Sequence, residues 1–421
     1  MAEAEVRKLA TRAKLASRSL ASQPRSVKDT VLESVAQKLE AEADAPSSTL
    51  IAANRQDIEA ATQAGLDAAM IDRLRLDGRR IRAMAKALRE IAQADDPVGA
   101  VVNMDRRPNG LLVGRVRMPL GVIAMIYESR PNVTLEAFAL CFKSGNAVLL
   151  RGGKEARRSN DALLHLAHAA LAEAGIDEGA ALLVPPGARE EIRELVGLTG
   201  LVDLAIPRGG EALIRFVTEH ARVPVIQHYK GVCHLFVDEG ADLAMAERLV
   251  EDGKLVRVGV CNALECLLVD EHEAERFVPR LARFIEQGLE VRGDERVVTL
   301  LPGANRASED DWGREFLAKI LAVRVVSGLD GALDHIARYG SNHTEVIATR
   351  DYARAQRFLR EVDACCVLVN ASTRFNDGGE LGLGAEMGIS TSKLHAYGPM
   401  GLEHLTTLKW IGYGDGQTRG G

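Results

Sequence analysis

Hydrophobic residues recur at intervals of three and four positions up to about residue 95. The clearest sets are Leu32, Val35 and Leu39, followed by Ile81, Met84, Leu88 and Ile91. This spacing places apolar side chains on one face of a helix, so we expect the chain to open with amphipathic helices. The polar and glycine-containing stretch 95–99 ends this pattern.

Residues 99–117 show a different pattern, with two short runs on either side of Pro108-Asn109-Gly110. An Asn-Gly pair supplies the positive φ angles of a tight turn, and the segment is therefore predicted to form a β-hairpin. A hairpin placed between helical and α/β segments is more typical of assembly than of catalysis.

From Gly121 onward, short apolar runs alternate with amphipathic stretches. Such runs are typical of buried parallel strands that are separated by helices. The first series of expected strands covers residues 122–126, 147–150, 181–184 and 201–206. A second series, after about Val223, covers residues 235–237, 264–269, 323–326, 345–348 and 366–369, with a helix at 274–289. Together they predict an α/β protein with two doubly wound domains.

The same pattern predicts the domain boundaries. Residues 1–98 and 118–230 are expected to form a first domain, and the glycine-rich segment 371–403 is expected to pack back on it. Residues 231–370 are expected to form a second domain. The hairpin at 99–117 and the tail at 404–421, with a final strand at 405–411, are expected to form a small β element outside both domains.

The composition is that of an ordinary globular protein. Of 421 residues, 47% are apolar and 27% are charged, and the net charge is −6. A weakly acidic chain with 4% aromatic residues lacks the basic surface and stacking side chains that nucleic-acid binding needs. The acidic N-terminus and the absence of an apolar run of about 20 residues argue against a signal peptide or membrane span. We therefore expect a cytoplasmic protein with no membrane partner.

The six cysteines form no Cys-x-x-Cys pair, and the ten histidines show no metal-ligand spacing. We therefore expect reduced thiols and no metal site. Cys261 differs from the other cysteines because it lies in a short loop, with Lys254 and Arg257 shortly before it. A nearby cation can lower the pKa of a thiol and make it a nucleophile. Taken alone, however, a cysteine of this kind is more often a buried structural residue.

The tripeptide Arg-Gly-Gly occurs twice, each time after an expected strand and before an expected helix. Glycines let backbone N–H groups approach an anion, the helix N-terminus adds its dipole, and a guanidinium can hold phosphate oxygens. The candidate phosphate ligands are Arg151, Gly152 and Gly153, and then Arg208, Gly209 and Gly210. Ordinary strand-to-helix turns with solvated arginines are the alternative. The usual Gly-x-Gly-x-x-Gly fingerprint does not follow any expected strand.

Two further arginines lie among small polar residues after expected strands. They occur in Ser129-Arg130-Pro131-Asn132 and in Ser372-Thr373-Arg374. Both segments are candidates for anion recognition, and both are equally compatible with loop capping.

Motifs spread over nearly the whole chain carry a family resemblance. They are Asp72-Arg73-Leu74, Asp96-Pro97-Val98-Gly99, Tyr127-Glu128-Ser129-Arg130-Pro131-Asn132-Val133-Thr134, Gly145-Asn146-Ala147-Val148-Leu149-Leu150-Arg151-Gly152-Gly153-Lys154-Glu155, Pro207-Arg208-Gly209-Gly210, Cys261-Asn262-Ala263, Val369-Asn370-Ala371-Ser372-Thr373-Arg374-Phe375 and Gly398-Pro399-Met400-Gly401-Leu402-Glu403. In this order they resemble the aldehyde dehydrogenase superfamily. The resemblance is closer to the branch that reduces γ-glutamyl phosphate in proline biosynthesis, and it implies an aldehyde-dehydrogenase-like α/β fold.

The resemblance implies NADPH-dependent reduction of L-glutamyl 5-phosphate to L-glutamate 5-semialdehyde and phosphate. Cys261 would attack the acyl phosphate, and hydride transfer to the resulting thioester would yield the aldehyde. The Asn132 side chain and the Cys261 backbone N–H are the implied donors to the oxyanion. Candidates for holding the substrate's carboxylate and ammonium groups are Arg130, Ser372, Thr373 and Arg374.

Three further positions are interpreted through this resemblance. Aldehyde-oxidising members carry a glutamate that activates water, and its position falls near His228 here, which suits a reductase that must not hydrolyse its thioester. The glutamate that holds the adenosine ribose in NAD-dependent members corresponds to Lys154, whose charge favours the 2′-phosphate of NADPH. Glu315 corresponds to a ligand of the nicotinamide ribose.

The chain also departs from the usual pattern of this branch, at Asp252-Gly253-Lys254, at Gly259 and at His395-Ala396-Tyr397. These departures affect the expected loop geometry and rate more than the reaction. The alternatives are a hydrolytic aldehyde dehydrogenase and a catalytically silent scaffold of the same fold. The resemblance also implies a homo-oligomer formed through the hairpin at 99–117 and the tail at 404–421, and a possible association with glutamate 5-kinase, which makes the acyl phosphate.

Overall fold

The computed structural model describes residues 2–45, 47–185 and 189–419. The chain divides into two compact units, each described separately below. Unit 1 comprises Met1–Gln227, Leu383–Gly388 and Met400–Gly421, and unit 2 comprises His228–Gly382 and Ile389–Pro399.

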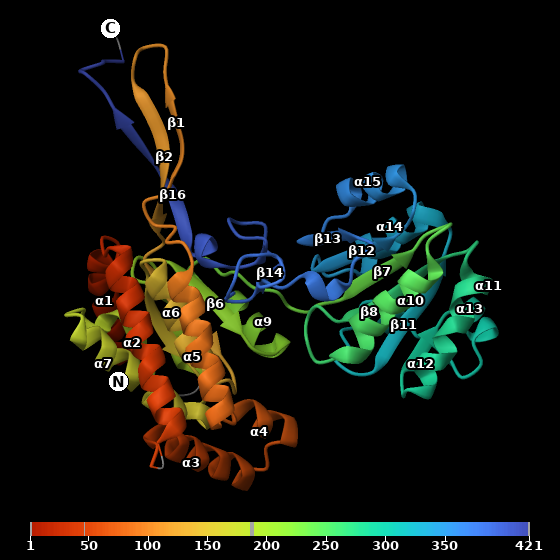
Figure 1. Cartoon of the computed structure of the whole chain (residues 1–421), viewed down its shortest axis with the longest axis horizontal. Coiled ribbons are helices and arrows are strands. Elements are labelled where there is room, and N and C mark those ends of the chain that lie inside the picture. The colour runs from red at the N-terminus through yellow and green to blue at the C-terminus, as the bar shows by residue number, and fades with distance from the viewer. Residues whose placement is uncertain (1, 46, 186–188, 420–421) are drawn as a thin grey trace. The chain divides into compact units, whose positions relative to one another are not determined.

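Unit 1 opens with the expected helices (Figure 1). They are α1 (Ala2–Leu20), α2 (Arg25–Asp44), α3 (Thr49–Gln63), α4 (Ala68–Leu74) and α5 (Gly78–Gln93). In α5 the side chains of Ile81, Met84, Leu88 and Ile91 are all buried, as their spacing predicts. The helix begins where the Asp77 carboxylate accepts a hydrogen bond from the backbone N–H of Arg80.

The main sheet of unit 1 is parallel, with strand order β5-β4-β3-β6. Its strands are β3 (Val122–Tyr127), β4 (Ala147–Arg151), β5 (Ala181–Leu183) and β6 (Leu204–Arg208). The further helices of unit 1 are α6 (Asn132–Lys143), α7 (Arg157–Glu173), α8 (Arg189–Gly197) and α9 (Glu211–His220). Its short helical turns are η1 (Lys154–Ala156), η2 (Glu178–Ala180) and η7 (Leu402–Leu405). Every residue of β3 is buried, which explains why this strand is a continuous apolar run. The chain leaves β3 on one side for β4 and returns on the other side with β6, which creates a topological switch point between β3 and β6.

A separate antiparallel sheet extends from unit 1, in the order β1-β2-β16 (Figure 1). Its strands are β1 (Val101–Arg106), β2 (Leu112–Pro119) and β16 (Thr406–Tyr413). The expected hairpin is present, but its turn differs from the expected one. Gly110 has a positive φ of 87° and Asn109 does not, because the turn is closed by the Gly110 N–H donating to the Arg107 carbonyl. Pro108 and Asn109 therefore occupy the two central positions of the turn.

Unit 2 contains a seven-stranded sheet in which all neighbours are parallel, with the order β10-β9-β11-β8-β7-β12-β13. The strands are β7 (Cys233–Val237), β8 (Leu264–Asp270), β9 (Glu290–Gly293), β10 (Asn305–Arg306), β11 (Ile320–Val326), β12 (Thr344–Ala348) and β13 (Cys366–Val369), and a small separate sheet pairs β14 (Ile389–Ser390) with β15 (Gly398–Pro399). The short strands β9 and β10 were not expected, because they lack a continuous apolar run.

Helices cover both faces of this sheet. They are α10 (Leu243–Glu251), α11 (Ala274–Phe277), α12 (Ala282–Glu286), α13 (Glu295–Leu300), α14 (Gly328–Tyr339) and α15 (Tyr352–Glu361), with turns η3 (Asp252–Val256), η4 (Val278–Leu281), η5 (Glu309–Asp311) and η6 (Thr373–Phe375). One core joins residues of β7 and β8 to α10–α13, and a second core on alternate strand positions joins them to α14 and α15. The expected helix at 274–289 is interrupted at Pro279, which has no N–H for a continuous α-helix.

The expectation for residues 371–403 was wrong for most of the segment. Residues 371–382 and 389–399 belong to unit 2, and only 383–388 and 400–403 join unit 1. The physical reason lies in buried hydrogen bonds: the Asn376 amide donates to Thr344 Oγ1, and the Asn262 amide donates to the carbonyls of Arg374 and Asn376. Among the described helices, none has both the length and the apolar character that crossing a membrane requires.

Asn146 connects three parts of unit 1 and provides a test of this packing. Its buried amide accepts a hydrogen bond from Gly121 N at 2.7 Å and donates to the carbonyl of Leu405 at 2.9 Å. Asn146→Ala should lower the free energy of unfolding by about 2 kcal/mol, because buried partners lose their hydrogen bonds. Urea titration would measure the change. The exposed Asn103→Ala is the control, and an equal effect of the two variants would contradict this assignment.

Candidate functional site

The two Arg-Gly-Gly turns lie where the sheet topology of unit 1 predicts a ligand. One follows β4 and the other follows β6, and β3 lies between these two strands. Arg151 and Arg208 are the last residues of their strands, and both are partly buried. Lys154 follows in η1 and is exposed. The carboxyl ends of strands beside a switch point are the usual ligand site of such a sheet.

Carboxylates of the chain already engage both turns, which the sequence did not predict. Glu128 Oε2 accepts a hydrogen bond from the N–H of Gly210 at 3.0 Å, and it would lie 2.5 Å from a Cβ added at Gly209. In the other turn, Glu155 Oε1 accepts from the backbone N–H and the hydroxyl of Ser129, and it would lie 2.0 Å from a Cβ added at Gly153. The glycines are thus needed for internal carboxylates, and a phosphate could bind the Gly210 N–H only after Glu128 moves.

Gly152 has a packing role. A Cβ added there would lie 2.3 Å from Nδ2 of Asn160 on α7, so the glycine allows α7 to approach the end of β4 closely. Burial lowers the pKa of the Arg151 guanidinium. The nearby Glu191, Glu155 and Glu128 carboxylates act in the opposite direction and favour its charge.

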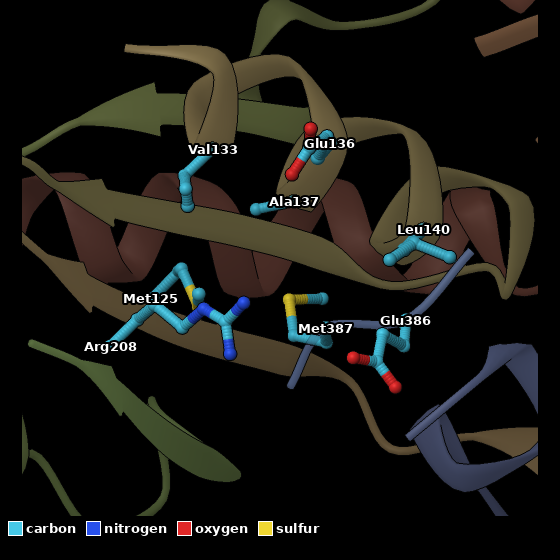
Figure 2. A pocket seen from close by; sticks show the side chains of 8 residues that line it. All are labelled: Met125, Val133, Glu136, Ala137, Leu140, Arg208, Glu386 and Met387. Atoms are coloured by element: carbon cyan, nitrogen blue, oxygen red, sulfur yellow. The ribbon is translucent and has the colours of Figure 1, made fainter. Parts of the chain in front are cut away.

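Asn132 is the first residue of α6, and its side-chain amide donates to Glu136 Oε1 one turn further along, at 2.9 Å. Arg130 lies in the turn that leads to this helix, after Ser129, which has a positive φ of 41°. Glu136 and Arg208 both line a pocket of unit 1. In Figure 2, Val133, Ala137 and Leu140 of α6 face Met125, Arg208 and Met387 across this pocket, and Glu386 completes the lining.

Cys261 lies in unit 2, in a turn closed by the Ala263 N–H donating to the Val260 carbonyl just before β8. It is partly exposed, whereas Cys141, Cys233, Cys266 and Cys366 are buried. Burial raises the pKa of the Cys233 thiol well above its usual range, and that of Cys366 to about 11. Cys365 is also partly exposed, but burial raises its pKa to about 12. Accessibility therefore distinguishes Cys261 from the buried thiols.

The carbonyl group of Cys261 is held by the start of β7. A Cβ added at Gly231 would lie 1.9 Å from the Cys261 carbonyl oxygen, so only glycine allows this approach. The Cys233 thiol donates to the same oxygen at 3.2 Å. Gly231 in turn donates its N–H to Glu315 Oε1 at 3.0 Å. Glu315, which was expected to hold a nicotinamide ribose, is found in the structure to fix the backbone of Gly231 beside the Cys261 carbonyl.

Lys254 is committed to a buried ion pair. It lies in the π-helical turn η3, and its ammonium contacts the carboxylate of Glu265, with both side chains fully buried. Burial lowers the pKa of Lys254 and raises that of Glu265 to about 7, so both groups shift toward their neutral forms. Arg257 is exposed. Lys254 was expected to act as a cation on the Cys261 thiol. In the structure, its ammonium is instead paired with the Glu265 carboxylate.

The segment 372–376 lies in the same unit as Cys261 and is connected to it through Asn262. The Arg374 guanidinium donates to Asn262 Oδ1 at 2.6 Å, and Arg374 N donates to Ser372 Oγ. Thr373 Oγ1 is buried and has no hydrogen-bond partner among the described residues. Of the expected substrate ligands, Ser372, Thr373 and Arg374 are therefore brought together, whereas Arg130 belongs to unit 1.

Three potential metal ligands meet in unit 2 although their sequence spacing gave no sign of it. Ligand atoms of His234, Cys266 and His335 lie within 4.8 Å of one another. Adjacent strands place His234 beside Cys266 and Glu345. Glu345 Oε2 accepts a hydrogen bond from the His234 backbone N–H at 3.1 Å and lies 2.8 Å from the ring Nδ1. Burial lowers the pKa of His234, but the Glu345 carboxylate outweighs this effect and the pKa rises to about 10.

The hydrogen bonds of His335 argue against metal binding by this cluster. Arg324 lies 3.1 Å from His335 Nδ1 and can only donate, so Nδ1 must accept and the proton of the neutral ring resides on Nε2. Burial lowers the pKa of His335 to about 2, and therefore the ring stays neutral. Nε2 faces Cys266 Sγ at 3.5 Å, and this nitrogen carries a proton where a metal would need a lone pair.

Two glycine substitutions test whether Gly231 holds the Cys261 carbonyl in place. Gly231→Ala should displace the Cys261 backbone, and we expect the free energy of unfolding to fall by about 1–3 kcal/mol and the rate of Cys261 alkylation by iodoacetamide to change. Gly259→Ala, two residues before the thiol, meets no atom within 4 Å and should change neither quantity appreciably. If the two variants have the same free energy of unfolding and the same alkylation rate, Gly231 does not hold the Cys261 backbone.

Known proteins match this chain over most or nearly all of its length. A model described as the aldehyde dehydrogenase family matches residues 1–297. A γ-glutamyl phosphate reductase of Sorangium cellulosum is 64% identical over 418 residues, which cover 99% of this chain and 98% of the relative. One from Geobacter metallireducens is 53% identical over 416 residues, which cover 99% of each chain.

A crystal structure of γ-glutamyl phosphate reductase from Thermotoga maritima has a TM-score of 0.96 and 42% identity, and covers 99% of this chain and 100% of that chain. At 18% identity, an NADP complex of glyceraldehyde-3-phosphate dehydrogenase from Methanocaldococcus jannaschii shares the fold, with a TM-score of 0.68 over 98% of this chain and 95% of that chain. The chain therefore belongs to the aldehyde dehydrogenase family of oxidoreductases, in the branch formed by the γ-glutamyl phosphate reductases.

Proposed function

We propose that the protein reduces L-glutamyl 5-phosphate to L-glutamate 5-semialdehyde and phosphate with NADPH, the second step of proline biosynthesis from glutamate. The observation that carries this proposal is Cys261, an accessible thiol whose backbone is fixed by Gly231 and Cys233. Close relatives over 99% of the chain, named for this reduction, support the same substrate.

The chemistry assigned to the chain begins at the Cys261 sulfur. Its thiolate attacks the acyl carbon, the carbon–oxygen bond to phosphate breaks, and phosphate leaves with the electron pair. The thioester is then reduced, and the thiohemiacetal expels the thiolate to release the aldehyde. The Asn132 amide and the Cys261 backbone N–H are the proposed donors to the oxyanion in these steps. Glu136, which accepts from Asn132, would hold that amide in a fixed orientation.

The residues at the ends of β4 and β6 are compatible with NADPH, which supplies the hydride when bound. Arg151, Lys154 and Arg208 provide positive charge for its phosphates, and the exposed Lys154 favours the 2′-phosphate. Glu128 and Glu155 are carboxylates that accept hydrogen bonds beside the same turns, as ribose hydroxyls require. Members of the family use NAD or NADP, and Lys154 is our reason for preferring NADP.

The position of His228 supports reduction over hydrolysis. Its ring Nδ1 lies 2.8 Å from the carbonyl of Ile389, which can only accept, so Nδ1 carries a proton. Nδ1 therefore cannot act as a base, and the glutamate that activates water in aldehyde-oxidising members has no carboxylate counterpart at this position. The thioester on Cys261 would therefore persist until phosphate or hydride reaches it.

We propose that the substrate's carboxylate binds Arg374, with Ser372 and Thr373 beside it, and that Arg130 contributes from unit 1. We also propose a cytoplasmic homo-oligomer formed through the β1-β2-β16 sheet, and possible association with glutamate 5-kinase. This sheet exposes Val101, Val102, Trp410 and Tyr413, with Trp410 68% and Tyr413 62% accessible, and such side chains are typical of an interface.

The reverse reaction tests the proposed function. We expect reduction of NADP⁺ by glutamate 5-semialdehyde to require phosphate, to fall at least about 1000-fold in Cys261→Ala because the nucleophile is lost, and to exceed the rate with NAD⁺. Lys154→Glu should reduce the preference for NADP⁺. Steady-state measurement of the reduced cofactor at 340 nm, the absorbance band of nicotinamide, would follow each rate.

The other outcomes would identify a different function. Formation of glutamate without phosphate would indicate the hydrolytic aldehyde dehydrogenase. Binding of NADPH without turnover, and equal inactivity of the native chain and Cys261→Ala, would indicate a catalytically silent scaffold. Equal rates with NAD⁺ and NADP⁺ would contradict only the role of Lys154, and not the proposed reaction.

A further inference from the structure

We propose that Asn262 is a positioning residue that holds the Arg374 guanidinium for the α-carboxylate of the substrate, and so sets the preference for aldehydes and acyl phosphates that carry a carboxylate. The inference rests on the proposed function, in which Arg374 binds that group. Asn262 follows the nucleophile directly in the chain, and it is only 5% exposed.

The hydrogen bonds of the Asn262 amide determine its orientation. Arg374 Nη1 lies 2.6 Å from Oδ1, and because arginine can only donate, this atom must be the amide oxygen. Nδ2 lies 3.2 Å from the carbonyl oxygen of Arg374 and 3.0 Å from that of Asn376, and both of these can only accept. Both ends of the amide are thus used, and exchanging its oxygen and nitrogen would place donor against donor.

These bonds fix Arg374 at its side chain and at its backbone simultaneously. The loop is also anchored by Asn376, whose amide donates to Thr344 Oγ1 at 2.8 Å at the start of β12, and by Ser372, whose hydroxyl accepts from Arg374 N. A free arginine side chain has several rotatable bonds, and ordering them reduces the affinity for a ligand. Prior ordering by Asn262 avoids this loss when a carboxylate binds.

The same residue connects the guanidinium to the thiol. Asn262 shares a peptide bond with Cys261, and the Cys261 carbonyl is held by Gly231 and Cys233. Positions 261, 262 and 374 therefore form one rigid assembly within unit 2. An assembly of this kind favours a substrate whose carboxylate and reactive carbon are separated by one fixed length of chain.

Asn262→Asp is the most informative variant, because it replaces the amide donor by an oxygen and adds a negative charge while hardly changing the side-chain volume. The new carboxylate would neutralise the Arg374 guanidinium and would oppose the carbonyls of Arg374 and Asn376. In the reverse assay with NADP⁺ and phosphate, we expect KM for glutamate 5-semialdehyde to rise at least about tenfold. For butanal, which lacks the carboxylate, kcat/KM should change by less than twofold. KM for NADP⁺ should be unchanged.

A matched control is available in unit 1. Asn54 is 1% exposed and also makes three hydrogen bonds, donating to Leu74 O and Ser159 Oγ and accepting from Leu76 N. Asn54→Asp should lower the thermal unfolding midpoint by an amount similar to that in Asn262→Asp, while leaving KM for glutamate 5-semialdehyde within twofold of the native value. If Asn262→Asp does not fold, Asn262→Ser, which keeps a small polar side chain, is compared in the same assays.

Three results are decisive. An equal loss with both aldehydes in the Asn262 variant would overturn the positioning role, since a general distortion of the Cys261 loop would then explain it. An unchanged KM for glutamate 5-semialdehyde would overturn it as well. Arg374→Gln should lower kcat/KM for glutamate 5-semialdehyde more than kcat/KM for butanal. If it affects both aldehydes equally while phosphate-dependent activity persists, the assignment of the carboxylate to Arg374 is wrong, although the reductase reaction stands.

Discussion

The position of Cys261, the proposed nucleophile, depends on one close contact between two backbones. The Cys261 carbonyl oxygen approaches Gly231 to a distance at which no side chain could be accommodated, and the Cys233 thiol donates to the same oxygen. Because Gly231 is also fixed by Glu315, the loop is held from β7 on one side and from the 372–376 segment, through Asn262, on the other. An accessible thiol on a rigid backbone is what an acyl-transfer reaction requires.

In unit 2, two pairs of buried ionisable groups are partnered within the chain. Lys254 contacts Glu265 and His234 contacts Glu345, whereas in unit 1 the exposed Glu128 and the half-buried Glu155 lie at the two glycine turns. Removing one member of such a buried pair would leave a charge without a partner and would be destabilising. The carboxylates in the turns also have a functional implication, because a phosphate that binds at Gly210 must compete with Glu128.

The sequence predicts the α/β architecture well, because buried parallel strands such as β3, β7 and β8 are continuous apolar runs between glycine or polar turns. It predicts short or polar strands such as β9 poorly, and it places residues 371–382 on the wrong unit. Cys261 emerges from the family resemblance, whereas the Gly231–Cys261 contact and the Asn262–Arg374 bond do not, since tertiary contacts between segments distant in the sequence leave no local pattern.

The central claim is that Cys261 carries a thioester that phosphate, and not water, removes. The most direct measurement mixes the protein with glutamate 5-semialdehyde and NADP⁺ in phosphate-free buffer, quenches it with acid and determines the mass of the peptide that contains Cys261. The account predicts a glutamyl group on this cysteine that persists without phosphate and disappears when phosphate is added. Accumulation of free glutamate in the absence of phosphate, with an unmodified Cys261 peptide, would contradict it.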